Sequence, residues 1–496
     1  MLTRYIAELA PLHSELILIV GAMLLLLWGA FRPETAREAE VISWGAIAVL
    51  ILAAGVLATQ PPGALTMFDG SFRFDAFARF MKMIVLISSA GALLLAANDM
   101  REGKYLKFEY AVLLLLATAG MLMMISANDL IGLYLALELQ SLALYVLAAF
   151  KRDDVRSSEA GLKYFVLGAL SSGMLLYGAS LIYGFTGATN FNDIAAVALT
   201  KGAGQNIGLI FGLVFLMVGL AFKISAVPFH MWTPDVYQGA PTPVTALFSA
   251  APKAAAFALL TRVMITAFGG IKPQWQQIIV FLSIASMVLG AVAAIGQTNI
   301  KRLLAYSSIG NMGFVLVGLA AASPEGIEGV LIYLATYLVM TLGSFAVVLC
   351  MRRDSGPVED IDDLSGLATT NPGMAATMAI MMFSLAGIPP LAGFWGKYYV
   401  FLAAVKADLW PLAIIGVVAS VIGAFYYIRI VIIMYVNEPK AGAVNRFHRV
   451  PLREGTVMAL ASLITLLGFL PFPLRNGSLG DWIIATASAA ARSLFG

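Results

Sequence analysis

The sequence predicts an all-α, polytopic membrane protein. Of its 496 residues, 60% are hydrophobic and only 12% are charged, and the mean hydropathy is +0.88. Water-soluble domains contain about 25% charged residues. Apolar runs also recur along the chain, and about 20 mostly apolar residues are enough for a helix to cross a lipid bilayer. We therefore expect bilayer-spanning helices joined by connections that are too short to hold a soluble domain.

These runs predict about fourteen transmembrane helices. Their approximate ranges are 14–31, 41–58, 80–97, 109–126, 130–150, 161–186, 207–224 (continuing brokenly to 237), 243–268, 276–296, 302–322, 327–350, 374–404, 409–436 and 455–472. The seventh and the twelfth are too long for one straight helix, and both contain proline, which removes a backbone hydrogen bond and breaks a helix. We therefore expect both to be broken. The stretch 477–496 is short and weakly apolar, and we expect it to lie at the membrane interface.

The connections between the spans predict the orientation of the chain. The first apolar run is followed, not preceded, by arginines, so we expect a retained span and not a cleaved signal peptide. Sixteen Lys and Arg residues lie in the odd-numbered connections and five in the even-numbered ones. Because short cytoplasmic loops carry an excess of Lys and Arg, both termini are expected on the periplasmic side. The segment DGSFRFDAFARF alternates apolar and polar residues, which predicts a small extended or hairpin element.

Composition and motifs argue against several other functions. The net charge of +3 is small for this length and gives no reason to expect nucleic acid as a partner. The single cysteine, Cys350, excludes an internal disulfide, and three scattered histidines do not suggest a metal or haem site. The chain also lacks a Walker phosphate-binding loop and a strand-led dinucleotide motif. We therefore expect no cofactor in this chain, and we expect another subunit or a second ion gradient to drive any transport.

Four ionisable residues lie near the middle of predicted spans: Glu138, Lys223, Lys253 and Lys397. A charge at mid-bilayer costs about 2.5–3.5 kcal/mol on insertion scales, and such residues usually mark ion pathways. Each lysine is also close to a proline, where carbonyl groups freed by the helix break can solvate its charge. The sequence therefore predicts that these residues move an ion. The alternative is snorkelling, in which the head of a lysine reaches water at the membrane surface.

Further polar residues extend this set. Lys223 is the expected partner of Glu138, because a neighbouring carboxylate favours the charged form of lysine. Such a pair can load and release a proton as its separation changes, and a purely structural ion pair is the alternative. His230 ionises near neutral pH and is a candidate proton relay, or only a partner for carbonyls of the broken helix.

The tenth span and the two prolines add two weaker patterns. Ser307, Ser308 and Asn311 could hold a file of water through this span, or simply stabilise helix packing. Pro228 in VPFHMW and Pro390 in IPPLAGFW each precede an aromatic pair, and they are 162 residues apart, or about five spans. Because five is odd, the two surrounding units would be inverted relative to each other, which is typical of transporters.

Three long segments resemble a known family. They are AFKISAVPFHMWTPDVYQGAPTPVTALFSAAPKAAAFALLTRV, NIKRLLAYSSIGNMGFVLVGLA and FSLAGIPPLAGFWGKYYVF, and the resemblance covers most of residues 110–436. They are similar to the antiporter-like membrane subunits of respiratory complex I and of multi-subunit Na+/H+ antiporters. Within this family the short length and Lys397 are most similar to the subunit N branch of bacterial NADH:quinone oxidoreductase. A long C-terminal extension and a glutamate at position 397 are typical of other branches.

The resemblance implies a fold and a function. It implies N-terminal helices in residues 1–109, inverted five-helix repeats in 110–268 and 276–436, and a final loop, helix and tail in 437–496. It implies proton transfer by Glu138, Lys223, Lys253 and Lys397, with His230 in the connecting polar axis. The partners would be the lipid bilayer of a bacterial inner membrane, protons, and the other membrane subunits of complex I. NADH oxidation and quinone reduction would take place elsewhere in that complex. A subunit of a Na+/H+ antiporter and a non-conducting membrane scaffold are the alternative functions.

Overall fold

The chain folds into two compact, almost wholly helical units, which confirms the predicted all-α class. The computed structural model describes residues 9–60, 63–200, 202–353, 356–439, 447, 449–469 and 479–495. The first unit contains Met1–Ile224, Ala251–Gln276 and Ala489–Gly496, and the second contains Ser225–Ala250 and Gln277–Ser488. The chain therefore passes into the second unit after Ile224 and returns to the first after Ala250.

The first unit contains seven long helices, a β-hairpin and several short helical turns among its described residues. Its elements are η1 (Ala10–Leu12), α2 (His13–Ala30), α3 (Ala36–Thr59), β1 (Leu65–Met67), β2 (Phe72–Phe74), α4 (Ala76–Glu102), α5 (Phe108–Ser126), α6 (Leu130–Ala148), α7 (Val155–Thr186), α8 (Phe191–Ala198), η2 (Ala203–Gln205), α9 (Ile207–Lys223), α12 (Ala251–Arg262), the π-helical turn η3 (Val263–Ala267) and η4 (Gly269–Ile271). Short polar side chains begin several of these helices: Asp75 accepts a hydrogen bond from Ala78 N at 2.8 Å and so caps the orphan N–H groups at the start of α4.

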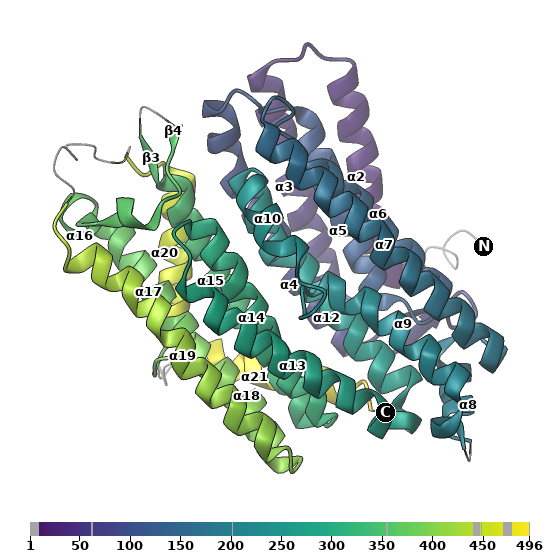
Figure 1. Cartoon of the computed structure of the whole chain (residues 1–496). Coiled ribbons are helices and arrows are strands. Elements are labelled where there is room, and N and C mark those ends of the chain that lie inside the picture. Colours follow the sequence, from purple (N-terminus) through teal and green to yellow (C-terminus); the bar gives the residue numbers. More distant parts are fainter. Residues whose placement is uncertain are drawn as a thin grey trace. The chain divides into compact units, whose positions relative to one another are not determined.

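The second unit is built in the same way from long helices and short connections. Its elements are α10 (Trp232–Gly239), α11 (Thr242–Ser249), α14 (Ile300–Ala321), α15 (Pro324–Cys350), β3 (Arg352–Arg353), β4 (Gly356–Pro357), η5 (Ile361–Leu364), α16 (Leu367–Thr370), α17 (Pro372–Ala386), α18 (Ala392–Lys406), α19 (Trp410–Tyr435) and α20 (Leu452–Leu467). The long helix α13 (Lys272–Ile295) and the C-terminal helix α21 (Leu479–Arg492) each have residues in both units. Figure 1 labels these elements along the chain.

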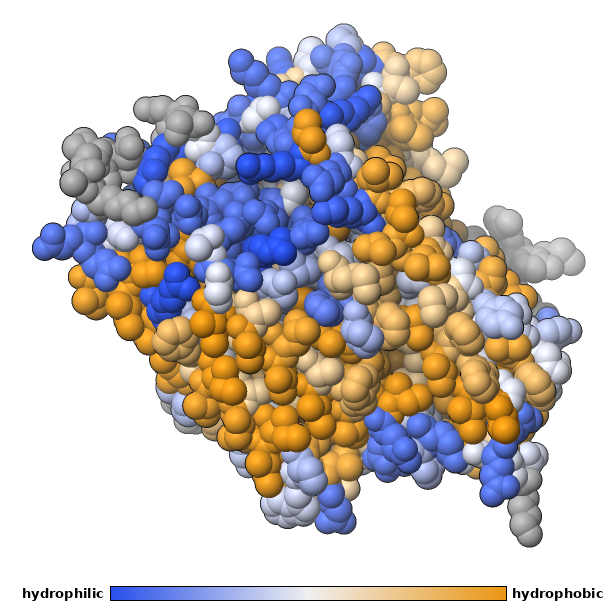
Figure 2. Space-filling model, in the orientation of Figure 1, coloured by the Kyte–Doolittle hydropathy of each residue, from blue (hydrophilic) through white to orange (hydrophobic). Residues whose placement is uncertain are grey.

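Eleven helical segments of the described chain are long and apolar enough to cross a membrane. They coincide with eleven of the fourteen predicted spans. The other three spans fall on shorter helices, namely α9, the pair α17 and α18, and α20. In Figure 2, hydrophobic side chains cover the sides of α13, α18 and α19, whereas hydrophilic ones gather around β3 and β4. This distribution is the one expected of helices that face lipid along their sides.

Both helices that the sequence predicts to be broken are discontinuous. Helix α9 ends at Lys223, and α10 begins only at Trp232, so Pro228 lies in the irregular segment between them. Helix α17 ends at Ala386 and α18 begins at Ala392, with Pro390 between them. A third break separates α11 from α12 at Ala250, two residues before Pro252, the proline beside Lys253. The predicted hairpin also forms, as the antiparallel pair β1 and β2.

One pattern of backbone contacts occurs in both units. In the first unit, the residues around the start of α6 pair with those around the start of α8: Leu130 N donates to Thr189 O at 3.0 Å and Phe191 N donates to Asn128 O at 2.9 Å. In the second, Ile300 N donates to Glu359 O and Ile361 N donates to Thr298 O, both at 2.8 Å. Every residue of the second set lies 170 positions after its counterpart in the first.

Candidate functional site

The predicted acid lies on helix α6 of the first unit. Asp129 caps the N-terminus of this helix by accepting a hydrogen bond from Gly132 N. Glu138 follows two and a half turns later and is half-buried. Ser172 of α7 donates its hydroxyl hydrogen bond to the Glu138 carboxylate. The acid is thus held between α6 and α7 by a buried hydroxyl group.

Lys223 is the last residue of α9, and its side chain reaches α6. Its Nζ donates to Ser141 Oγ at 2.7 Å and to Tyr145 OH at 3.4 Å. Ser141 and Tyr145 are three and seven residues after Glu138, so all three side chains lie on one face of α6. The described hydrogen bonds of Lys223 therefore go to hydroxyl groups one and two turns from Glu138. The end of α9 therefore contacts α6 about one turn after Glu138. The direct hydrogen-bond partner of Lys223 is Ser141, where we had expected Glu138.

Lys253 lies on α12, in the same unit. It is 1% exposed, and α12 packs against α4, α5 and α9. Pro252, the second residue of α12, is tolerated there because the first turn of a helix needs no intrahelical N–H donor. Lys223 and Lys397 are also buried, at 5% and 7% exposed. None of the three lysines therefore extends its amine to the surface of the chain, as snorkelling would require.

Lys397 lies on α18 of the second unit and contacts the broken end of α17. Its Nζ donates to Leu385 O and Ala386 O, both at 3.0 Å, and to Ser420 Oγ at 2.8 Å. It also lies 4.8 Å from the centre of the Phe314 ring, where a cation–π attraction is favourable. The last carbonyls of a helix lack intrahelical partners and carry partial negative charge. The break in the twelfth predicted span thus provides the carbonyl partners that we expected for a buried lysine.

A polar network connects α14, α15 and α19 near Lys397. Asn311 donates to Tyr427 OH at 3.3 Å and accepts from Tyr333 OH at 2.7 Å. Ser307 is hydrogen-bonded to the same Tyr427 hydroxyl. A cavity of about 10 Å³, lined in part by Asn311, Tyr427 and Lys397, leaves room for about one water molecule. The polar residues of the tenth predicted span therefore both join helices and line space beside a buried amine.

A second small cavity of about 10 Å³ continues this polar region. Its lining includes Ser249, Ser307 and Tyr337. Tyr337 OH also donates to Ser308 Oγ at 2.7 Å. Ser308, like Ser307, is therefore bonded to a tyrosine of a neighbouring helix in this unit.

His230 lies in the irregular segment between α9 and α10. The start of this segment is held by a hydrogen bond of 2.9 Å from Val227 N to Ser286 Oγ. His230 is half-buried, and its Nδ1 has no hydrogen-bond partner within the described chain. The structure places His230 in the second unit with Lys397, whereas Glu138, Lys223 and Lys253 belong to the first.

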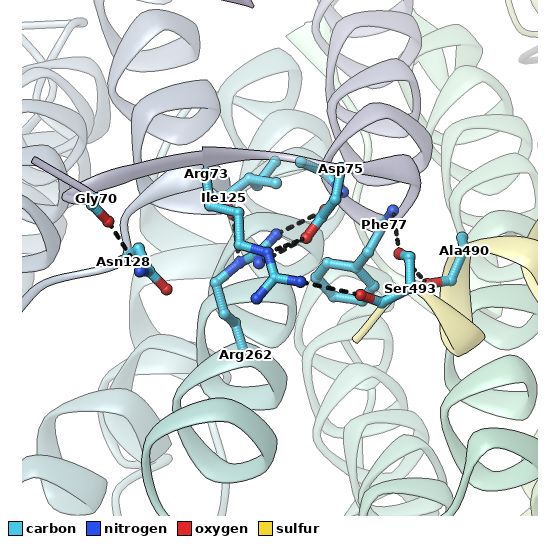
Figure 3. A network of polar contacts seen from close by, with 10 residues as sticks. Gly70, Arg73, Asp75, Phe77, Ile125, Asn128, Arg262, Ala490 and Ser493 are labelled. Atoms are coloured by element: carbon cyan, nitrogen blue, oxygen red, sulfur yellow. Dashed lines mark hydrogen bonds and ion pairs between the residues drawn. The ribbon is translucent and has the colours of Figure 1, made fainter. Parts of the chain in front are cut away.

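Sequence reasoning missed four buried charges in the first unit. Lys82 Nζ of α4 lies 2.6 Å from Glu15 Oε1 of α2, and both side chains are 0% exposed. Arg262 of α12 forms a two-pronged ion pair with Asp75, with both N–O distances 2.9 Å (Figure 3). Lys82 and Arg262 were detectable, because each lies inside a predicted span. Their partners lie at or before the edges of the spans, where a charge is expected to be solvated.

Comparison with known proteins agrees with this geometry. Residues 127–423 match the family described as NADH:quinone oxidoreductase/Mrp antiporter, TM. The chain is 57% identical over 491 residues to NADH-quinone oxidoreductase subunit N of Methylobacterium nodulans, with 98% of each chain covered. It is also 57% identical over 491 residues to subunit N 1 of Rhizobium meliloti, with 99% of each covered.

Solved structures show the same fold. A chain of respiratory complex I from Thermus thermophilus is 30% identical, with a TM-score of 0.79 over 96% of this chain and 99% of that one. A chain of the Mrp complex from Dietzia is 22% identical, with a TM-score of 0.83 over 98% and 97%. At that lower identity the likeness shows the fold alone.

Proposed function

We propose a route by which protons cross this chain, which belongs to the NADH:quinone oxidoreductase/Mrp antiporter family of membrane subunits. Its relatives are named subunit N of NADH-quinone oxidoreductase, and the chain is the corresponding proton-translocating membrane subunit of a bacterial complex I. Its partners are the other membrane subunits of that complex. The redox chemistry belongs to other subunits, and the residues of this chain bind and move protons.

In this proposal a proton reaches Lys223 from the cytoplasmic side, passes to Lys253 and then leaves towards the periplasm near Lys397. His230 belongs to the polar connection between the last two. The burial of all three amines is the observation that carries the proposal. An ammonium group inside a membrane protein makes insertion less favourable. Such groups are therefore rare, and those that are present usually serve transport. The hydroxyl and carbonyl partners of Lys223 and Lys397 make the charged forms tolerable without making them permanent.

Glu138 is assigned the role of setting the proton affinity of Lys223. Its carboxylate lies one turn from Ser141, the residue that contacts the amine. At that separation the carboxylate stabilises the ammonium electrostatically without a direct contact. Protonating Glu138 would remove this stabilisation and favour release of the proton from Lys223.

We further infer that residues 110–268 and 276–436 are inverted repeats, and that both termini are periplasmic. The recurrence of the Leu130 and Phe191 contacts at a spacing of 170 residues supports the repeats. An odd number of spans between the counterparts gives the inversion. The excess of Lys and Arg in the odd-numbered connections supports the orientation.

Alanine variants of Lys223 and Glu138 test the route. Each variant is assembled into the whole complex, and proton translocation is measured in inverted membrane vesicles with a pH-sensitive dye during NADH oxidation. Lys163→Ala on α7 is the matched control, because that lysine is 42% exposed and forms an ion pair with Glu159 on its own helix. Both test variants are expected to lose translocation per assembled complex, and the control to keep it. Normal translocation by assembled Lys223→Ala would exclude the route.

Measurements on the same vesicles distinguish the proposed function from the two alternatives. A subunit of a Na+/H+ antiporter would show translocation that depends on sodium and continues without NADH. A non-conducting scaffold would show loss of the complex on a native gel, with normal translocation by whatever complex remains. We expect neither result.

A further inference from the structure

Each unit contains an arginine on one helix that donates a hydrogen bond to a backbone carbonyl group at the C-terminal end of another helix. In the first unit, Arg262 of α12 donates from Nε to Ile125 O of α5 at 3.1 Å. In the second, Arg429 of α19 donates from one terminal nitrogen, Nη1, to Ile295 O of α13 at 3.0 Å. The two isoleucines are 170 residues apart, which is the spacing of the repeated backbone contacts. The arginines are 167 residues apart, so they reach equivalent carbonyl groups from positions that differ by three residues, or nearly one helical turn.

In the first unit the arginine is held from two directions. Its two terminal nitrogens bind both carboxylate oxygens of Asp75, while Nε reaches the backbone of α5 (Figure 3). The guanidinium is 0% exposed, and its central carbon lies 5.3 Å from the centre of the Phe77 ring. Such a planar two-pronged contact fixes the orientation of the side chain as well as its position. Arg262 is also the last residue of α12 before the helix widens into the π-helical turn η3.

In the second unit, Arg429 makes fewer hydrogen bonds and uses only one nitrogen. Arg429 is half-buried, and its Nη1 donates to Ile295 O and, at 3.5 Å, to Gln297 O. Ile295 is the last residue of α13, so its carbonyl has no partner within that helix. A cation at this position also interacts favourably with the negative end of the helix dipole.

The residue nine positions before each arginine is either a lysine of the proposed proton route or a direct partner of one. These residues are Lys253 on α12 and Ser420 on α19, and Ser420 binds the Lys397 amine. Nine residues of an α-helix are two and a half turns and about 13.5 Å along the axis. Each arginine therefore points away from the side of the helix that carries the proton-route residue. A contact there to a fixed carbonyl oxygen sets both the rotation and the depth of the whole helix.

We propose that Arg262 and Arg429 are positioning residues for proton transfer. They hold α12 and α19 in the rotation that presents Lys253 to the route and Ser420 to Lys397. This proposal rests on the proposed function, because it assigns the arginines a role only through Lys253 and Lys397.

Variants in the whole complex test the proposal through translocation per assembled complex. Arg429→Gln removes the charge without leaving a described acid unpaired, whereas Arg262→Gln is combined with Asp75→Asn so that the Asp75 carboxylate is not left buried without Arg262. Arg73, which also pairs with Asp75, is 19% exposed and keeps its hydrogen bond to Ser493 O. Arg429→Lys is the conservative variant, because Arg429 uses a single nitrogen and a lysine amine can replace it. Arg262 uses three nitrogens, so Arg262→Lys is not expected to substitute. Arg101→Gln is the control, since that arginine is 54% exposed.

The expected loss of translocation is given relative to the loss in the variants Lys253→Ala and Lys397→Ala. Arg429→Gln should remove at least half of the translocation that Lys397→Ala removes, and Arg429→Lys should restore it. The Arg262 and Asp75 double variant should lose as much as Lys253→Ala and show no further loss when combined with it. A purely structural role would lower the amount of complex on a native gel and leave translocation per complex unchanged.

Two outcomes would overturn the proposal while leaving the proton route intact. One is full translocation by assembled Arg429→Gln while Lys397→Ala has lost it. The other is failure of Arg429→Gln to assemble, which would assign this arginine to folding. Normal translocation by Lys253→Ala and Lys397→Ala would instead refute the route itself.

Discussion

Ser141 provides the sharpest test of how the first unit holds a buried proton. Its hydroxyl oxygen lies 2.7 Å from Lys223 Nζ, whereas the other described partner, Tyr145 OH, is at 3.4 Å, near the limit of a hydrogen bond. The substitution Ser141→Ala removes the shorter contact. It also removes a hydrogen bond to Leu137 O on the same helix. That second bond is of the kind that contributes little to a helix that is already fully bonded.

The effect on Lys223 can be estimated from the contact that is lost. A hydrogen bond to a charged group contributes about 1.5–3 kcal/mol. Its loss makes protonated Lys223 about 10- to 150-fold less favourable relative to the neutral amine. Proton translocation at neutral pH should therefore fall towards the level of Lys223→Ala. Lowering the pH by about one to two units should recover it, because each pH unit offsets about 1.36 kcal/mol.

Inverted vesicles assayed over a range of pH give the measurement. Ser88→Ala is the matched control, since Ser88 is a buried serine of α4 whose hydroxyl bonds Ile84 O of its own helix at 2.7 Å. The control should keep the pH profile of the unaltered complex. An assembled Ser141→Ala complex with an unchanged rate and an unchanged pH profile would show that this hydroxyl does not hold the proton-carrying amine.

Two further predictions concern residues outside the proton route. Replacing only Lys82 by Met, or only Glu15 by Gln, leaves the other residue as an unpaired buried charge. Such a charge lowers the free energy of unfolding by about 3–5 kcal/mol. Each single variant should therefore lower the yield of complex on a native gel, and the double variant should restore it; a double variant no better than the singles would refute the coupling. Gly393→Ala places a methyl group against the backbone oxygen of Ser384 where α18 starts close to α17, whereas Gly373→Ala meets open space. The first should lower the melting temperature of the purified complex and the second should not, and equal melting temperatures would contradict the close approach.

Much of the fold was predictable because the bilayer restricts the choices. Apolar length alone indicated the helices, and Pro228 and Pro390 indicated two of the three breaks. The third break lies beside Pro252, which we had used only as a source of carbonyl partners for Lys253 and not to divide the eighth predicted span. Pro252 is the second residue of α12 and cannot donate a backbone hydrogen bond to the preceding turn. The division of the chain into compact units was not predictable, because the exchange of residues 225–250 between units depends on packing between helices.

The site was predictable in its residue types but not in its contacts. Lys397 met the carbonyl partners expected beside a broken helix, because that expectation depends only on local chain geometry. The hydrogen-bond partners of Lys223, Ser141 and Tyr145, were not predicted, since the height at which α9 meets α6 depends on the packing of both helices. Ser141 and Ser172 gave no usable signal, because small hydroxyl residues are common wherever membrane helices pack. Arg262 lies inside a predicted span, but we overlooked it because its partner, Asp75, lies outside the spans, in the connection before the third one.

The two units stabilise a buried amine by physically different means, and the difference suggests different roles. The described contacts of Lys397 are two helix-end carbonyls, a hydroxyl and an aromatic ring, all of which keep the same charge at every pH near neutrality. Lys223 of α9 instead contacts the face of α6 that carries Glu138, whose charge disappears when the carboxylate binds a proton. A helix dipole cannot be switched in this way. In the proposed route, Lys223 would therefore be the amine whose proton affinity changes during a cycle, and Lys397 the one whose surroundings remain constant. Neutralising Glu138 should accordingly impair proton uptake at Lys223 and leave the contacts of Lys397 unchanged.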